Sequence, residues 1–202
     1  MNFKIHETFQ KVVQGEGFHS GRPCDFIRLY GCGVGCHYCD TGYSRYNKKK
    51  ISFTIKNEKE LLKELKSKFV VISGGEPFIN KNLPDLCNYL LDNDIEVSIE
   101  TSGAFYLDID KRVWITLSPK HHISKYPVKK EFYDRANELK IVIENGREVD
   151  FYKDLIKKFN GLKYLQPEND CYDRSLEITL QLLQKMQDFK LSLQLHKFIG
   201  VQ

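Results

Sequence analysis

Three cysteines lie within eight residues of one another and are the side chains in this sequence best suited to metal chemistry. Cys32, Cys36 and Cys39 follow the spacing C-x3-C-x2-C, and three glycines accompany them. Thiolates are the usual protein ligands of iron–sulfur clusters. Three of them can hold three irons of a 4Fe–4S cubane and leave the fourth iron open, and glycine lets the backbone wrap closely around such a group. The motif therefore predicts a 4Fe–4S cluster with one open iron.

A structural zinc ion is the main alternative for these cysteines. Zinc in structural sites normally has four ligands in a closed tetrahedron. His37 or Asp40 could supply the fourth ligand, but each is a sequence neighbour of a cysteine, which makes a tetrahedral cage awkward. Buried, inert thiols are a further alternative. The other three cysteines have no ligand spacing and are expected to pack in the interior: Cys24, Cys87 and Cys171.

The composition is that of an ordinary globular domain. The 202 residues are 41% hydrophobic and 29% charged, with a formal net charge of +4, which fits one domain over residues 1–202. No apolar stretch reaches the ~20 residues of a membrane helix, and residues 1–7 do not resemble a secretory signal. We therefore expect a cytoplasmic protein with no membrane or nucleic-acid partner. Lys48, Lys49 and Lys50 are expected to form a solvated loop.

Apolar runs that predict strands alternate along the chain with segments of helical periodicity. The predicted strands are residues 26–30, 69–73, 96–100, 114–118, 138–143, 163–166 and 192–196. The predicted helices are residues 57–68, 83–93, 148–159 and 175–189. This alternation indicates an α/β fold of parallel βαβ units. About six units indicate an incomplete, TIM-like barrel, in which sites form at the carboxyl ends of the strands.

Four further motifs follow predicted strands directly. They are residues 74–77 (GGEP), 99–103 (IETSG), 117–120 (LSPK) and 165–169 (LQPEN). Glycines allow a ligand to approach the backbone, and a serine hydroxyl beside a lysine ammonium can bind a sugar and a carboxylate. Each motif alone could be a plain strand-to-helix turn. Their succession at strand ends, after the cysteine motif, favours a binding site.

Together these motifs resemble the radical S-adenosylmethionine (SAM) superfamily, in which Tyr38 would take the aromatic position before the third cysteine. The remainder of the chain is similar to the 7-carboxy-7-deazaguanine synthase family. That resemblance covers nearly the whole chain and rests on residues 7–9, 13–17, 21–23, 26–29, 39–41, 118–120 and 193–202.

The resemblance implies a reaction and its cofactors. The substrate would be 6-carboxy-5,6,7,8-tetrahydropterin, and SAM at the 4Fe–4S cluster would yield a 5′-deoxyadenosyl radical that takes a hydrogen from C6. Ring contraction and loss of ammonia would give 7-carboxy-7-deazaguanine, in 7-deazapurine (queuosine-type) biosynthesis. SAM would be regenerated, and Mg²⁺ would bind the substrate carboxylate. An electron donor such as flavodoxin or ferredoxin and a homodimer are also implied.

The resemblance also assigns roles to individual residues, with no catalytic side chain beyond the cofactors. Thr41 would bind Mg²⁺, a hard cation that a neutral hydroxyl suits, and the guanidinium of Arg28 would bind the substrate carboxylate. The cluster ligands would be Cys32, Cys36 and Cys39. The SAM contacts would be Tyr38, Cys39, Asp40, Gly75, Ser118, Pro119, Lys120, Gln166, Pro167, Glu168 and Asn169. The substrate contacts would be Val13, Gln14, Gly15, Arg28, Ser73 and the terminal carboxylate of Gln202.

Two competing functions fit part of the sequence. An activase that places a glycyl radical on another protein would share the cysteine motif, but it would not need the QGEG segment, Thr41 or an anchored C-terminus. A non-enzymatic metal-binding module would not need the GGEP and SPK motifs at successive strand ends. An anchored C-terminus is expected here, because Phe198, Ile199 and Val201 should pack against the domain.

Overall fold

The computed structural model describes residues 1–43 and 51–201, which form one nine-stranded sheet in the order β3-β1-β2-β4-β5-β6-β7-β8-β9. The neighbours from β2 through β9 are parallel, and β1 pairs antiparallel with both β2 and β3. This is the predicted α/β architecture of an incomplete barrel. The predictions for Lys48, Lys49, Lys50 and Gln202 fall outside the described residues.

The elements have the following bounds. The strands are β1 (Asn2–Val13), β2 (Pro23–Leu29), β3 (Thr54–Asn57), β4 (Phe69–Gly74), β5 (Glu96–Thr101), β6 (Trp114–Leu117), β7 (Glu138–Ile143), β8 (Leu162–Pro167) and β9 (Phe189–Leu191). The α-helices are α1 (Glu58–Glu64), α2 (Leu83–Leu91), α3 (Phe132–Arg135), α4 (Arg147–Phe151), α5 (Lys153–Lys158), α6 (Tyr172–Lys185) and α7 (Leu195–Ile199). Short 3-10 turns are η1 (Gly17–His19), η2 (Pro77–Ile79) and η3 (His121–Ile123).

The side chains of each strand alternate between the two faces of the sheet, and the outer face carries the main apolar core. On β7, Leu139, Ile141 and Ile143 are fully buried in the main core. Lys140 and Val142 project from the opposite face and line a cavity. Successive side chains of a strand point to opposite sides of the sheet, so this strand presents its charged residues to the concave interior. Polar side chains also face the cavity near the carboxyl ends of β5 and β8, at Glu100 and Gln166. On β2 and β4, by contrast, Cys24, Phe69 and Val71 form a second, smaller apolar cluster on this face.

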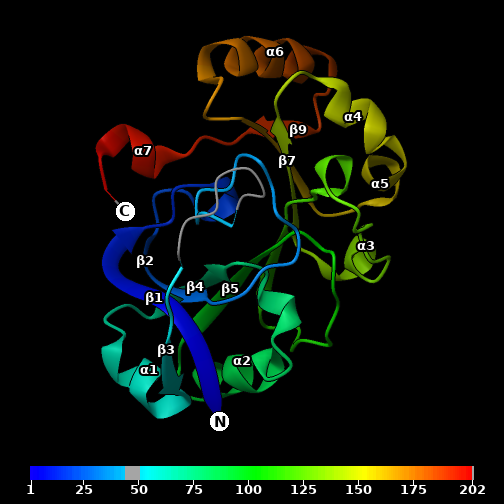
Figure 1. The fold of residues 1–202 in the computed structure, drawn as a ribbon. Helices are drawn as coiled ribbons and strands as arrows, with labels where there is room; N and C mark the ends of the chain where they lie inside the picture. Colours follow the sequence, from blue (N-terminus) through cyan, green and yellow to red (C-terminus); the bar gives the residue numbers. More distant parts are fainter. Residues whose placement is uncertain (44–50, 202) are drawn as a thin grey trace.

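The helices cover the apolar face of the sheet. In Figure 1 they follow one another as an arc from α2, at the bottom, past α3, α5 and α4 to α6, at the top, and α7 lies on the other side of the sheet. Helix α1 begins at Glu58 because Asn57 and Glu60 form a capping box at its N-terminus. Residues of α2, such as Leu83, Leu86 and Leu90, are fully buried in the main core. In the part of the chain that the structure describes, no helix is both long and apolar enough to span a bilayer.

Most predicted elements agree with the structure, and the exceptions have physical reasons. The prediction of a strand over residues 192–196 is wrong, because the last strand is β9 and residues 195–199 form α7. The helix predicted over residues 148–159 is divided at Tyr152, between α4 and α5. The long strand β1 was not predicted, because two register shifts interrupt its alternation and Lys11 takes a φ of 58°.

Candidate active site

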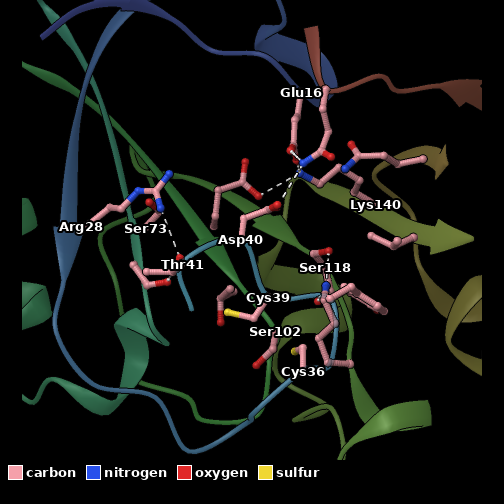
Figure 2. A pocket seen from close by; sticks show the side chains of 18 of the residues that line it. Glu16, Arg28, Cys36, Cys39, Asp40, Thr41, Ser73, Ser102, Ser118 and Lys140 are labelled. Atoms are coloured by element: carbon pink, nitrogen blue, oxygen red, sulfur yellow. Dashed lines mark hydrogen bonds and ion pairs between the residues drawn. The ribbon is translucent and has the colours of Figure 1, made fainter. Parts of the chain in front are cut away.

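A cavity of about 270 Å³ opens on the inner face of the sheet at the carboxyl ends of the parallel strands. It contains 17 of the predicted site residues: Val13, Gln14, Arg28, Cys32, Cys36, Tyr38, Cys39, Asp40, Thr41, Ser73, Gly75, Ser118, Lys120, Gln166, Pro167, Glu168 and Asn169. Gly15 and Pro119 do not line it. Figure 2 shows Arg28, Ser73 and Thr41 on one side of this cavity and Cys36, Cys39 and Ser102 on another.

Residues 31–41, which we call the cysteine loop, follow β2 and are fixed at their start by hydrogen bonds. The Gly31 N–H donates to the Tyr43 hydroxyl at 2.8 Å, and the Gly31 carbonyl accepts from the Glu76 N–H at 2.9 Å. The Val34 N–H donates to Cys32 Sγ at 3.4 Å, and the Val34 side chain is buried. The cysteine loop is therefore held at the end of β2 and by the segment that follows β4.

The residues present fit an iron–sulfur cluster better than a single metal ion. All three thiols are free and face the same cavity. Among the described residues, no three His, Cys, Asp or Glu side chains converge as one ion requires. In a cubane each thiolate binds a different iron, so separated thiols suit a cluster and argue against the zinc alternative. Burial raises the pKa of Cys36 to about 11, although Lys120 opposes the shift. Burial also raises the pKa of the Cys32 thiol, so binding of iron to these two thiols would displace their protons.

The GGEP segment joins the cysteine loop to the sheet. A Cβ on Gly75 would lie 1.9 Å from the Gly31 carbonyl oxygen, so only glycine permits this approach. Glu76 is buried and accepts hydrogen bonds from the Thr101 hydroxyl at 2.6 Å, the Ser102 N–H at 2.9 Å and the Ser102 hydroxyl. The glutamate thus ties the end of β4 to the end of β5, and we identify it as a positioning residue that the sequence analysis did not single out.

The SPK and LQPEN segments occupy the neighbouring strand ends. Lys120 Nζ donates to the Ser118 carbonyl at 2.8 Å and to its hydroxyl at 2.6 Å, and burial lowers the pKa of this lysine. Gln166 is buried, and its Oε1 accepts from the Ser192 hydroxyl at 2.7 Å. Glu168 accepts from the Cys171 N–H and from its thiol. Cys24 and Cys87 pack in the interior as predicted. The same prediction is wrong for Cys171, which is only half-buried.

Arg28 and Thr41 lie side by side opposite the thiols. Arg28 Nη1 donates to Thr41 Oγ1 at 3.3 Å, and Thr41 Oγ1 donates to the Gly74 carbonyl at 3.2 Å (Figure 2). Arg28 Nε lies 3.2 Å from Glu7 Oε1, but that nitrogen makes no geometrically good hydrogen bond among the described residues. The guanidinium therefore retains hydrogen-bonding capacity for a second carboxylate.

A buried charged group in the same cavity was not predicted. Lys140 is 3% exposed and forms ion pairs with Glu16 and, at 3.2 Å, with Glu100; Figure 2 labels the first pair. Gln14 Nε2 donates to Glu100 Oε1 at 3.1 Å. Burial pushes the pKa of Glu16 upward, but Lys140 outweighs it and brings the pKa to about 2. Burial is also the main cause that raises the pKa of Glu100. One sequence signal for this group was a lysine between two apolar residues, Leu139 and Ile141.

The C-terminal segment lies over one side of the cavity and is held by polar contacts. Lys197 Nζ pairs with Asp40 Oδ1 at 2.9 Å, Gln194 Nε2 donates to Glu16 Oε1 at 2.8 Å, and the Leu195 N–H donates to the Gly15 carbonyl. A Cβ on Gly15 would lie 2.1 Å from His196 Nδ1. The expected apolar anchoring is wrong, since these side chains are 58%, 53% and 43% exposed: Phe198, Ile199 and Val201.

Glu138 is the first residue of β7 and lies outside the cavity lining, and its burial allows a prediction about the pH dependence of stability. The side chain is buried, one oxygen accepts from the Phe18 N–H at 3.0 Å, and the other has no hydrogen-bond partner among the described residues. Burial raises the pKa of Glu138 to about 7 from the ordinary 4.5, although Lys140 opposes the shift. The folded protein then binds the proton more tightly, so the free energy of unfolding should fall by on the order of 2–3 kcal/mol as the pH rises from about 4.5 to about 7.

Replacement of Glu138 by glutamine should remove this component of the pH dependence, because the amide does not ionise. Urea unfolding of both proteins at about pH 5 and about pH 8 measures the difference. If wild type and variant lose equal stability between the two pH values, Glu138 is not the group responsible.

The half-barrel, the three cysteines and the motifs at the strand ends define the class of protein as a radical SAM enzyme. Residues 26–120 match the Radical SAM superfamily. The chain belongs to the 7-carboxy-7-deazaguanine synthase family. It is 36% identical to the 7-carboxy-7-deazaguanine synthase of Synechocystis sp. over 100% of this chain and 95% of the relative. It is 32% identical to the Buchnera aphidicola enzyme of the same name over the full length of both chains.

A solved structure agrees with this assignment. The crystal structure of QueE from Escherichia coli superposes with a TM-score of 0.83 at 28% identity, over 97% of this chain and 95% of that one. Membership of the family places the protein in 7-deazapurine biosynthesis as a radical SAM enzyme, with a 4Fe–4S cluster and SAM as its cofactors.

Proposed function

We propose that this enzyme converts 6-carboxy-5,6,7,8-tetrahydropterin to 7-carboxy-7-deazaguanine with release of ammonia. The observation that carries the proposal is that one cavity contains both the three cysteines and, across from them, the Arg28–Thr41 pair. A radical enzyme needs its cofactor and its substrate in contact within one enclosed space. The names of the full-length relatives support the same reaction.

We assign one side of the cavity to the cofactors. When bound, the cluster and SAM supply the electron and the 5′-deoxyadenosyl radical that abstracts hydrogen. Cys32, Cys36 and Cys39 would hold the cluster. Lys120, whose ammonium is fixed by Ser118, would face the SAM carboxylate. The other SAM contacts we propose are Tyr38, Asp40, Gly75, Pro119, Gln166, Pro167, Glu168 and Asn169.

The opposite side would bind the pterin. Arg28 and Thr41 would face its carboxylate, the latter through Mg²⁺, with Ser73 beside them. The pyrimidine edge of a pterin presents N–H donors, and the carboxylates of Glu16 and Glu100 supply acceptors that Lys140 holds in place. Val13, Gln14, Gly15 and the terminal carboxylate of Gln202 complete the proposed contacts.

The experiment that tests the proposal is turnover after anaerobic reconstitution with iron and sulfide. Protein, SAM, Mg²⁺ and a reductant are incubated with carboxytetrahydropterin, and the product is identified by mass. We expect 7-carboxy-7-deazaguanine, whereas cleavage of SAM without this product would reject the proposed substrate. A cluster-free control should give neither.

Replacement of Arg28 by alanine should raise the KM for the pterin far more than it changes SAM binding. Loss of a charged hydrogen bond costs on the order of 1.5–3 kcal/mol, which corresponds to a KM increase of roughly tenfold to a hundredfold. The measurement is steady-state kinetics with SAM affinity determined separately. An unchanged KM would exclude contact between Arg28 and the substrate. Arg22, paired with the exposed Glu96, offers a matched control whose replacement should leave KM unaltered.

We also propose that Mg²⁺ stimulates turnover through Thr41. Replacement of Thr41 by alanine should weaken the magnesium response and leave cluster content intact, while serine should restore the response because it retains the hydroxyl. The measurement is turnover against Mg²⁺ concentration at equal iron content. Identical magnesium dependence in the wild type and the alanine variant would exclude Thr41 as a ligand.

The remaining proposals concern the setting of the reaction. We propose that residues 1–202 act as a single radical SAM domain in the cytoplasm, where thiols stay reduced, and that the protein functions as a homodimer. The six free cysteines support a reducing compartment. We propose flavodoxin or ferredoxin as the electron donor, because each delivers one electron at a time.

A further inference from the structure

The guanidinium of Arg28 is contacted from β1 as well as from the cysteine loop. Arg28 Nη1 donates to Thr41 Oγ1 at 3.3 Å, as Figure 2 shows. Arg28 Nε lies 3.2 Å from Glu7 Oε1, and the guanidinium carbon lies 5.3 Å from the centre of the Phe9 ring. Because Nε is buried, a ligand in the cavity would meet the two Nη atoms of this arginine.

An irregularity in β1 places Glu7 on the same face of the sheet as Arg28. Ile5 pairs with Leu29 and Glu7 pairs with Arg28, so two steps along β1 correspond to one step along β2. Ile5 and Leu29 both lie in the main core. Strict alternation would put Glu7 on the core side together with Ile5. The extra residue, His6, turns Glu7 to the face that bears the arginine instead.

Glu7 contacts Arg28 from outside the cavity, because Glu7 does not line it, whereas Arg28 and Phe9 do. A group in this position can act on a substrate only through the arginine. Phe9 limits the movement of the guanidinium from a second direction, since it is buried and its ring stacks on that of Phe26 with centroids 4.7 Å apart. A guanidinium is planar, so its orientation decides whether its donors meet a carboxylate.

We propose that Glu7 is a positioning residue, which holds the Arg28 guanidinium so that its Nη atoms face the substrate carboxylate. The proposal rests on the proposed function, which assigns that carboxylate to Arg28. Ordering a long, flexible arginine side chain on binding costs conformational entropy. An ion pair that is formed before the substrate arrives removes part of this cost. Glu7 should therefore tighten substrate binding without touching the substrate.

The alternative is that Glu7 only joins β1 to β2 as a structural ion pair, and a second glutamate provides the comparison. Glu64 pairs with Lys56 at 2.6 Å and accepts from the Thr8 hydroxyl of β1 at 2.8 Å. The two glutamate side chains are similarly exposed, 34% for Glu7 and 32% for Glu64. Loss of either carboxylate should therefore have a similar, small effect on stability. Only a role through Arg28 predicts that the two differ in substrate binding.

The test is the affinity of two pterins for the reconstituted enzyme with SAM and Mg²⁺ but no reductant, measured by anaerobic calorimetry. One probe is 6-carboxy-5,6,7,8-tetrahydropterin, and the other is 5,6,7,8-tetrahydropterin, which lacks the carboxylate. Replacement Glu7→Gln should weaken binding of the carboxylated pterin about tenfold and leave the affinity for the second pterin unchanged. The control Glu64→Gln should change neither affinity. In a protein that already carries Arg28→Ala, Glu7→Gln should cause no further loss, because the arginine through which it acts is absent.

The possible results separate this proposal from the proposed function. Unchanged or tighter binding of the carboxylated pterin by the Glu7→Gln variant would overturn the proposal, because Glu7 would then be a purely structural or a competing group. Equal losses for both pterins, or losses that add to those of Arg28→Ala, would also overturn it, because Glu7 would then act on the shape of the cavity. If the wild-type protein binds the two pterins equally or binds neither, the proposed function fails instead.

Discussion

Replacement of Cys32, Cys36 or Cys39 by alanine should abolish both the cluster and all turnover. The three thiols face one cavity, and no three His, Cys, Asp or Glu side chains converge on one point among the described residues, so each thiol would bind a separate iron. Loss of any one leaves a second iron without a protein ligand. We expect loss of the broad visible absorbance of the reconstituted cluster and no cleavage of SAM. The measurements are iron content, the visible spectrum and SAM cleavage at equal protein concentration.

The control is replacement of Cys87 by alanine. Cys87 is fully buried in the core on α2, so its loss should lower stability modestly and leave cluster content and turnover unchanged. A cysteine-loop variant that keeps full iron content and activity would refute the cluster assignment. The same losses in the Cys87 variant would show that the assay reports folding and not ligation.

Replacement of Lys140 by methionine should produce the largest loss of stability. The lysine is 3% exposed, and its ammonium lies between the carboxylates of Glu16 and Glu100. Burial alone would lower the pKa of Lys140, but the two carboxylates and Glu138 raise it above its usual value, so it is charged at pH 7. Removing one partner of a buried ion pair typically costs about 3–5 kcal/mol, because a charge is left without compensation.

Urea unfolding at pH 7 measures this loss, with a surface pair as the matched control. Lys163 pairs at 2.8 Å with Asp188, which is 60% exposed, so Lys163→Met should cost no more than about 1 kcal/mol. Combining Lys140→Met with Glu16→Gln and Glu100→Gln should recover much of the lost stability, because the unpaired charges are gone. Equal costs for the Lys140 and Lys163 variants would show that the buried pairs contribute little.

The features that could be predicted from the sequence are those whose residues lie close together along the chain. The cysteine loop could be predicted because its ligands are close in sequence. The strands ending at Gly74 and Thr101 could be predicted because each is an apolar run before a turn motif. Placing these motifs together followed from parallel βαβ units, whose carboxyl ends share one edge of the sheet.

Features that depend on contacts between distant segments could not be predicted. The group formed by Glu16, Glu100 and Lys140 joins the loop after β1 to β5 and β7, and only the register of the folded sheet brings these residues together. The requirement for glycine at position 75 follows from the close approach of the Gly31 carbonyl, which only the folded structure shows. The C-terminal segment was misjudged because its apolar residues suggested packing, whereas Lys197 and Gln194 hold it.

The most direct test of the central claim is the stoichiometry of a single anaerobic reaction. Reconstituted protein is incubated with excess carboxytetrahydropterin, a limiting amount of SAM, Mg²⁺ and dithionite, and the deazaguanine, ammonia and remaining SAM are quantified. We predict equal amounts of 7-carboxy-7-deazaguanine and ammonia, each exceeding the SAM supplied, because SAM is regenerated. Consumption of SAM to methionine and 5′-deoxyadenosine with no deazaguanine would contradict the account.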